Sequence, residues 1–202
     1  MIIDALANFA TTVISHLGYL GIFFLMGLES ACIPIPSEVI MPFAGFLVIS
    51  GQFGFIGVVI IGSLGNLAGS LFSYWVGYRG GRPLIEKYGK FILLSHRDLD
   101  SSDRFFKKYG DSTVFFSRLL PVIRTFISLP AGISRMEIKK FILYTLAGVI
   151  PFTAFLAYAG VILNNNWDRL RPYFHKFDLA IVIVIVLAIA WFIVRHLKHR
   201  SN

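Results

Sequence analysis

The sequence ESACIPIPSE, residues 29–38, interrupts an apolar stretch and decides how the chain folds. It has an apolar run on either side and contains two glutamates and two prolines. One continuous helix through residues 17–50 would bury Glu29 and Glu38, and its prolines would remove helix hydrogen bonds that a bilayer cannot replace. Two short helices that enter and leave a membrane on the same side fit the sequence better. Residues 17–50 therefore predict a re-entrant hairpin.

The composition and the distribution of charge both indicate a membrane protein. Apolar residues make up 56% of the 202 residues and charged residues 15%, whereas soluble domains contain about 25% charged residues. The net charge of +8 is compatible with nucleic-acid binding, but the first lysine or arginine is Arg79, and basic residues lie between uncharged blocks such as 39–78. The positive-inside rule gives membrane proteins this distribution, so we expect no nucleic-acid partner.

Apolar runs of different lengths define the other elements. Residues 53–78 and 138–163 are long enough to span a bilayer, and residues 179–196 predict a C-terminal spanning helix. Residues 1–16 are too short and too polar to span, and we expect an interfacial helix there. Residues 79–110 are rich in basic residues and are expected to form a cytoplasmic amphipathic loop on the membrane surface.

A stripe of small residues runs along the predicted helix 53–78. Gly65, Gly69, Ser73 and Gly77 recur at every fourth position, so they share one face of the helix. Small side chains let two helix backbones approach each other closely inside a membrane. We therefore expect this stripe to be a helix-packing surface.

Residues 111–134 repeat the anomaly of the first hairpin, with arginines in place of glutamates. After a shift of 87 residues, Pro34 falls on Pro121 and Gly45 falls on Gly132, and an uncharged helix follows each segment. A re-entrant hairpin makes no net crossing and the next helix makes one, so the second copy starts on the opposite face. Inverted repeats with broken helices are a recurrent plan of transporters. The predicted hairpin-breaking residues are Pro34, Pro36, Pro121, Gly45 and Gly132.

The predicted fold is an all-α polytopic membrane protein with a single domain over residues 1–202. It is an inverted repeat of a re-entrant helical hairpin plus a transmembrane helix, with an N-terminal interfacial helix and a C-terminal transmembrane helix. The basic residues place the loop 79–110 and the C-terminal tail inside, and the N-terminus outside or at the interface. The connection 164–178 fits less well, because it would lie outside despite its basic residues.

Four charges lie inside the predicted hairpins. Each costs at least about 2.5–3.5 kcal/mol at the bilayer centre, so Glu29, Glu38, Arg118 and Arg124 must be paired or hydrated. One interpretation is two structural ion pairs that lock the hairpins together. The other is a transport site, because carboxylates in a low-dielectric cavity can exchange protons and arginine presents a fork suited to phosphate. Arg118, Arg124 and Ser37 would then bind a phosphate headgroup, while Glu29 and Glu38 carry protons.

Other chemistry finds no support in the sequence. The one cysteine excludes an internal disulfide and a cysteine-based zinc site, and the five histidines are scattered. Neither a GxSxG nor a GxGxxG spacing is present. We therefore expect no metal, no cofactor and no enzymatic activity.

Several motifs occur in the same order as in one known family of membrane proteins. They are Glu29, Pro34-Ile-Pro-Ser-Glu38, Ala44-Gly45, Gly69, Tyr74, Gly77, Gly81, Phe116-Ser-Arg118-Leu-Leu-Pro121, Arg124, Ala131-Gly132, Met136, Phe141 and Gly148. In these motifs, residues 17–163 resemble the DedA family, which carries the SNARE-associated or VTT domain. The resemblance implies a lipid scramblase or flippase linked to the proton motive force. It also implies that the essential acidic residues are Glu29 and Glu38 and the essential arginines are Arg118 and Arg124.

Together these observations predict a flippase that translocates undecaprenyl phosphate across the bacterial cytoplasmic membrane for carrier-lipid recycling. The alternatives are a phosphatidylethanolamine or other phospholipid flippase or scramblase, a proton-coupled cation antiporter that supports envelope homeostasis, and a scaffold whose charges only lock the fold. The expected partners are a lipid with a phosphate headgroup, protons and membrane lipids, and a homo-oligomer is compatible with the sequence. A dry, fully paired site would favour the scaffold.

Overall fold

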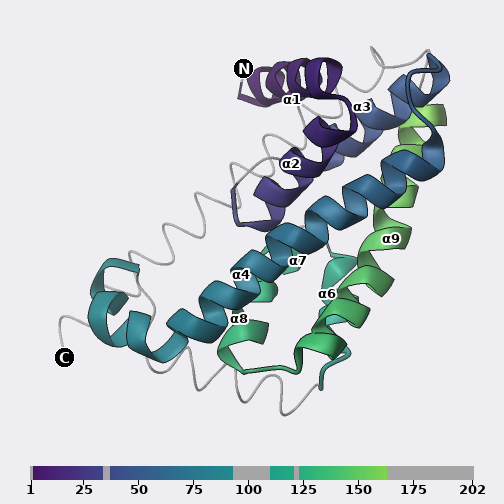
Figure 1. Cartoon of the computed structure of the whole chain (residues 1–202). Helices are drawn as coiled ribbons and strands as arrows, with labels where there is room; N and C mark the ends of the chain where they lie inside the picture. The colour runs from purple at the N-terminus through teal and green to yellow at the C-terminus, as the bar shows by residue number, and fades with distance from the viewer. Residues whose placement is uncertain (1, 34–36, 93–109, 121–122, 163–202) are drawn as a thin grey trace.

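The computed structural model describes residues 2–33, 37–92, 110–120 and 123–162, and within these ranges it contains helices and turns but no strand. The predicted spanning helix 179–196, most of the charged loop and the breakers Pro34, Pro36 and Pro121 lie outside the described residues. Figure 1 shows the helices, which are α1 (Ile2–Leu17), α2 (Tyr19–Ser30), α3 (Ser37–Ile49), α4 (Phe55–Ile92), α6 (Thr113–Arg118), α7 (Ile123–Phe126), α8 (Ser128–Ile133) and α9 (Ile138–Ile162).

Two long helices, α4 and α9, form the centre of the molecule (Figure 1). They run in opposite directions, because Ser63 of α4 hydrogen-bonds Thr153 in the second half of α9 (2.9 Å between the hydroxyl oxygens), whereas Tyr74 further along α4 hydrogen-bonds Met136 just before α9 begins. The segments Phe55–Gly80 and Ile138–Ile162 are long and apolar enough to cross a membrane.

The outward faces of both long helices carry large apolar side chains. Ile56 of α4 is 73% exposed and Phe155 of α9 is 68% exposed. Exposed apolar side chains recur along both helices, at Ile60, Leu64, Phe72, Leu143, Ile150 and Ile162. A soluble protein rarely leaves apolar surface of this extent in water, whereas lipid tails cover it at no cost.

Helix α4 continues past the point where the sequence analysis ends it. The expected spanning helix stops at residue 78 and a loop follows, but α4 reaches Ile92 and only its part up to Gly80 is apolar enough to span. The onset of charge at Arg79 marks the end of the apolar segment, and lysine, arginine and glutamate are all good helix formers. A change from apolar to charged residues therefore does not end a helix.

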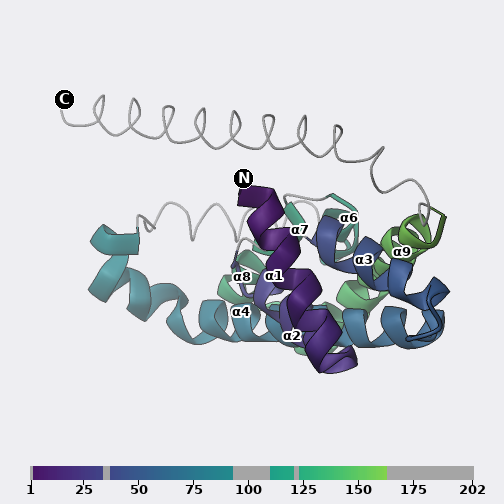
Figure 2. The ribbon, with the colours of Figure 1, turned by 90° about the horizontal axis from the view of Figure 1, so that it is seen from above.

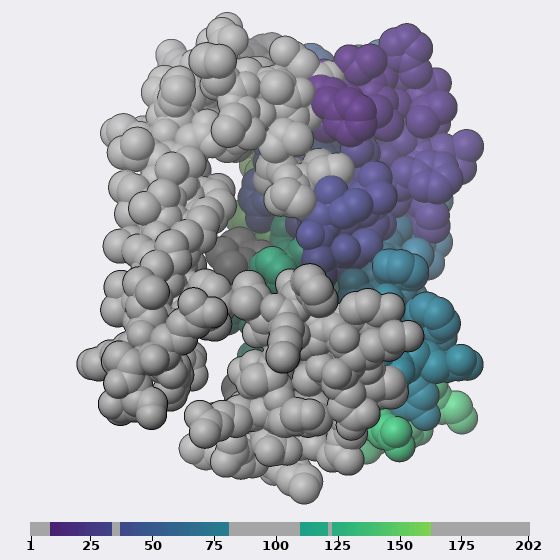
Figure 3. Space-filling view, turned by 90° about the vertical axis from the view of Figure 1, so that its left-hand side faces the viewer, coloured from purple at the N-terminus to yellow at the C-terminus, as the bar shows by residue number. Residues whose placement is uncertain are grey.

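The first interrupted segment bridges the two long helices. Its first half, α2, packs on α4, and its second half, α3, packs on α9. Helices α2 and α3 also contact each other, within an apolar core that includes Ile14 of α1 and Val58 of α4. Helix α1 packs across α2 and also contacts α3, as the view from above shows (Figure 2), and the purple surface of this part of the chain lies near the top of Figure 3.

The second interrupted segment bridges the same helices in the opposite order. Its first half, α6, packs on α9, and α8 packs on α4. Helices α7 and α8 are nearly continuous, because the Ile127 N–H still donates to the Ile123 carbonyl (3.0 Å). A second apolar core surrounds this segment and contains Val114, Ala131 and Phe141.

Small residues allow the interrupted segments to touch the long helices backbone to backbone. A Cβ atom on Gly45 would collide with the carbonyl of Ala157 in α9, and one on Gly132 would collide with the carbonyl of Tyr74 in α4. The next contacts along the same helix pairs are Gly160 with Pro42 and Gly77 with Leu129. In both pairs of contacts, the residues of the interrupted segments are 87 positions apart and those of the long helices are 83 apart.

Candidate functional site

Arg124 joins the two interrupted segments through a pair of carboxylates. Its Nη2 atom lies 2.7 Å from Glu29 Oε1, at the end of α2, and 3.0 Å from Glu38 Oε1, at the start of α3. The same nitrogen donates to Ser37 Oγ. Glu29, Ser37, Glu38 and Arg124 are called the ionic cluster below.

Ser37 connects the members of the ionic cluster. Its hydroxyl donates to Glu29 Oε1 (2.8 Å) and accepts from Arg124, and the residue is completely buried. It is the first residue of α3 and directly precedes Glu38. Ser37 and Arg124 are also 87 residues apart, so the predicted repeat relates them to each other.

The ionic cluster is neither fully dry nor fully paired. Arg124 and Glu29 are buried, but the side chain of Glu38 is 38% exposed. Among the described residues, buried Glu29 Oε2 and Arg124 Nε have no hydrogen-bond partner. One guanidinium faces two carboxylates, so the cluster has a net charge of −1 when both are ionised. Unpaired buried polar atoms are costly, and they give this cluster capacity for a further proton, water molecule or ligand.

Arg118 is buried next to the ionic cluster but has no carboxylate partner among the described residues. Its Nη1 donates to the main-chain carbonyl of Arg124 (2.7 Å), and its Nη2 donates to Ser128 Oγ (2.8 Å) and more weakly to Thr145 Oγ1 (3.4 Å). Only 1% of the residue is exposed. The two arginines therefore differ: Arg124 is the ion-paired one, and Arg118 holds the backbone that carries Arg124.

Aromatic rings cover both guanidinium groups. The Arg124 guanidinium carbon lies 4.1 Å from the centre of the Phe152 ring, and that of Arg118 lies 5.8 Å from the Phe141 ring. The ring faces attract cations and exclude water, so they partly compensate for the burial of these charges. Both phenylalanines belong to α9, which therefore forms one wall of the site.

The structure brings together the charged residues that the sequence singles out. Of the other predicted residues, Gly65 and Gly69 lie against the backbone of α2 at Phe23 and Gly27, and Ser73 Oγ donates to the Ser30 carbonyl (3.0 Å). Ser128 and Thr145, which bind Arg118, and Phe152, which packs on Arg124, were not predicted from the sequence. No motif distinguishes them, since hydroxyl and aromatic residues are frequent throughout these apolar helices.

Comparison with known proteins finds a family match that covers most of these site residues. The VTT domain family matches residues 35–162, which include most of the ionic cluster and both long helices. The chain belongs to this family. The resemblance to DedA proteins is thereby confirmed, and the chain is a membrane protein.

Three relatives extend the VTT domain match to most of the chain. Undecaprenyl phosphate transporter A of Bacillus subtilis is 38% identical, over 91% of this chain and 90% of the relative. The uncharacterized membrane protein YkoX of the same organism is 40% identical, over 92% and 83%. Undecaprenyl phosphate transporter A of Staphylococcus aureus is 31% identical, over 95% and 97%. No solved structure matches the chain.

Proposed function

We propose that this VTT domain protein is a proton-motive-force-linked flippase for undecaprenyl phosphate that serves carrier-lipid recycling in the bacterial cytoplasmic membrane. The observation that carries the proposal is the single Arg124 guanidinium held by Glu29 and Glu38, with Ser37 and the Phe152 ring against it. The names of two relatives that align over nearly their whole lengths support a lipid substrate with a phosphate headgroup. In this proposal the protein is a transporter and not an enzyme.

The proposed architecture is a single multi-pass membrane domain with two re-entrant hairpins in an inverted repeat. Each hairpin places one half on α4 and the other half on α9, and the two hairpins do so in opposite order. The equivalent glycine contacts of Gly45 and Gly132 support the same relation. Inverted repeats with broken helices give a transporter two related gates around one site.

The proposed coupling is a competition for Arg124 between the two carboxylates and the phosphate. With both carboxylates ionised, the ionic cluster has a net charge of −1 and repels a phosphate monoester, which carries about −1.5 to −2. Protonation of both Glu38 and Glu29 changes the net charge of the cluster to +1. Arg124 is then free to bind the headgroup with its planar fork. In this mechanism the phosphate headgroup and the protons therefore bind to the ionic cluster together.

Arg118 contributes a second cation in this mechanism. Its hydrogen bond to the Arg124 carbonyl fixes the backbone of α7, and its positive charge adds to the attraction for phosphate. Ser37 Oγ, which donates to Glu29 when the headgroup is absent, becomes available to phosphate once Glu29 is protonated. The site residues of the proposal are therefore Arg118, Arg124 and Ser37 for phosphate and Glu29 and Glu38 for protons.

Transport in reconstituted vesicles tests the proposal. The purified chain is reconstituted with a labelled undecaprenyl phosphate, and headgroup translocation is measured with and without a proton gradient. We expect Arg124→Ala and Glu38→Gln each to reduce gradient-driven transport at least tenfold. Lys139→Gln is the matched control, because Lys139 is an exposed cation outside the ionic cluster. Normal transport by both site variants would contradict the proposal, and competition by phosphatidylethanolamine would change the substrate.

A further inference from the structure

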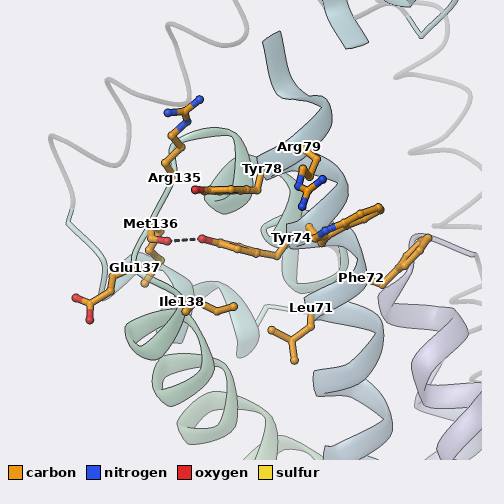
Figure 4. Close-up of a pocket in the computed structure, with 10 residues that line it drawn as sticks. Leu71, Phe72, Tyr74, Tyr78, Arg79, Arg135, Met136, Glu137 and Ile138 are labelled. Carbon is orange, nitrogen blue, oxygen red and sulfur yellow. Dashed lines mark hydrogen bonds between the residues drawn. The ribbon is translucent and has the colours of Figure 1, made fainter. Parts of the chain in front are cut away.

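A pocket lies where the apolar part of α4 ends, next to the turn that joins α8 to α9 (Figure 4). Its volume is about 750 Å³. Tyr74 forms its inner wall, with the Tyr74 hydroxyl hydrogen-bonded to the Met136 carbonyl. Leu71, Phe72, Trp75 and Ile138 form its apolar sides. Arg79 and Arg135 form its charged rim.

The two arginines of the rim are each held against an aromatic ring. The guanidinium carbon of Arg79 lies 5.7 Å from the Trp75 ring centre, and that of Arg135 lies 5.8 Å from the Tyr78 ring centre. Both arginines are exposed, and neither forms an ion pair with a described residue. The one acidic residue of the pocket, Glu137, has Lys140 within 3.9 Å. The rim is therefore a positively charged surface with free hydrogen-bond donors.

The backbone of Arg135 adds an independent observation. Arg135 has a φ angle of 52°, in the left-handed region, where it ends α8 with main-chain hydrogen bonds from Arg135 to Gly132 and from Met136 to Ala131. Glycine normally occupies this position of a helix end, and another L residue costs about 1–2 kcal/mol there. An arginine in this conformation points to a role for its side chain at the rim.

The position of the pocket along the helices matches the layers of a bilayer. Arg79 is next to the end of the apolar segment Phe55–Gly80, and Arg135 precedes the apolar segment Ile138–Ile162. Both cations therefore lie at the level of the lipid headgroups, while Leu71 and Phe72 lie further in, at the level of the acyl chains. Cationic pockets between helices at this level suit anionic headgroups.

We propose that this pocket binds an anionic phospholipid, with its phosphate between Arg79 and Arg135 and an acyl chain along the wall of Leu71 and Ile138. The pocket is separate from the ionic cluster, because Tyr74 in its wall packs on Phe141, with the two tilted rings 4.7 Å apart between centres, and Arg118 lies against that Phe141 ring. The proposal goes beyond the transport function and does not depend on it.

Native mass spectrometry of the purified full chain tests the proposal. Short-chain phosphatidylglycerol, phosphatidylcholine and glycerol phosphate are titrated in a neutral detergent, and the Kd of the first bound molecule is compared. An arginine near the membrane surface contributes about 1 kcal/mol to anionic-lipid binding, so Arg79→Gln and Arg135→Gln should each weaken phosphatidylglycerol binding about fivefold. Phosphatidylcholine should bind at least tenfold more weakly than phosphatidylglycerol.

Two further variants complete the test. Lys139→Gln removes a nearby exposed charge that does not line the pocket, and we expect less than a twofold change. Ile138→Trp fills the apolar part without a change of charge and should weaken phosphatidylglycerol binding while the fold is retained. The proposal would be overturned if phosphatidylglycerol and phosphatidylcholine bound equally, or if Lys139→Gln weakened binding as much as the rim variants. It would also be overturned if glycerol phosphate bound as tightly as whole phosphatidylglycerol. Because no transport is measured, failure of the flippase proposal leaves this result unaffected.

Discussion

At the residue scale, Arg124 is the cation that both carboxylates of the site share. It contacts Glu29 and Glu38 on either side of the break in the first interrupted segment, and thereby attaches the second segment to the first. Arg118 is equally buried, but its Nη atoms donate to a backbone carbonyl and two hydroxyl groups, and its Nε has no hydrogen-bond partner among the described residues. A buried ion pair adds little net stability, whereas removal of one partner is strongly destabilising. The shared cation therefore suits a site whose charges change partners.

Ser37 provides the first prediction at this scale. Ser37→Ala removes a completely buried hydroxyl that donates to Glu29 and accepts from Arg124, and it leaves both without that partner. We expect the free energy of unfolding to fall by about 1–3 kcal/mol. The matched control is Ser50→Ala, because the Ser50 hydroxyl bonds only to Leu47 within its own helix end. Thermal or denaturant unfolding in detergent measures the stability of both variants. Equal losses of stability in Ser37→Ala and Ser50→Ala would contradict the bridging role of Ser37.

The sequence identified the charged residues of the site but not how they pair. Glu29, Glu38 and Arg124 could be predicted, because a charge within an apolar run is rare and expensive. The sequence could not predict that Arg124 pairs with the carboxylates and Arg118 does not, since this depends on which guanidinium lies near the end of α2 and the start of α3. Ser128 and Phe152 could not be predicted either, because their role follows from packing against Arg118 and Arg124 and not from a local pattern.

At the element scale, both interrupted segments are fixed to the long helices by glycines. Gly45 meets α9 and Gly132 meets α4, each at a backbone carbonyl. The sequence already pairs these two glycines through the shift of 87 residues, although it does not reveal which helix each one contacts. It also fails to predict that α4 continues to Ile92, since charge ends the apolar segment but not the helix.

These contacts give a prediction for the packing of the segments. Gly45→Ala and Gly132→Ala each place a methyl group against a main-chain carbonyl that has no room to move. We expect each to cost about 1–3 kcal/mol of stability, as overpacking generally does. Gly54→Ala is the control, because its new Cβ atom would lie 3.8 Å from the Tyr19 hydroxyl, an ordinary contact. Melting in detergent checks the three variants; a loss for Gly54→Ala as large as for the others would contradict the assigned contacts.

At the scale of the whole molecule, the proposed inverted repeat has a consequence for topology. The chain between α3 and α4 and the chain between α8 and α9 should face opposite sides of the membrane, because the apolar part of α4 and one re-entrant hairpin lie between them. Gln52 is an exposed position in the first of these connections, and Lys139 is an exposed position in the first turn of α9, next to the second. The distribution of basic residues assigns Gln52 to the outside and Lys139 to the inside.

Cysteine labelling in intact cells tests this topology. Cys32 is the one native cysteine, so Cys32→Ser provides a background free of other thiols. In that background, a membrane-impermeant maleimide should label Gln52→Cys in intact cells and Lys139→Cys only after the membrane is opened. Labelling of both positions from the same side would exclude the inverted repeat, while the ionic cluster itself would remain as described.

The most direct test of the account is the pH dependence of headgroup binding by the purified protein. We predict that lower pH strengthens binding of undecaprenyl phosphate to the unmodified chain relative to Glu38→Gln, because protonation of Glu38 releases Arg124 and the glutamine variant is already neutral there. The free headgroup titrates identically in both experiments, so the difference between the two curves reports on the ionic cluster. At neutral pH, Glu38→Gln should bind the headgroup about tenfold more tightly, which corresponds to about 1.4 kcal/mol. Identical pH profiles and equal affinities for the two proteins would contradict competition for Arg124.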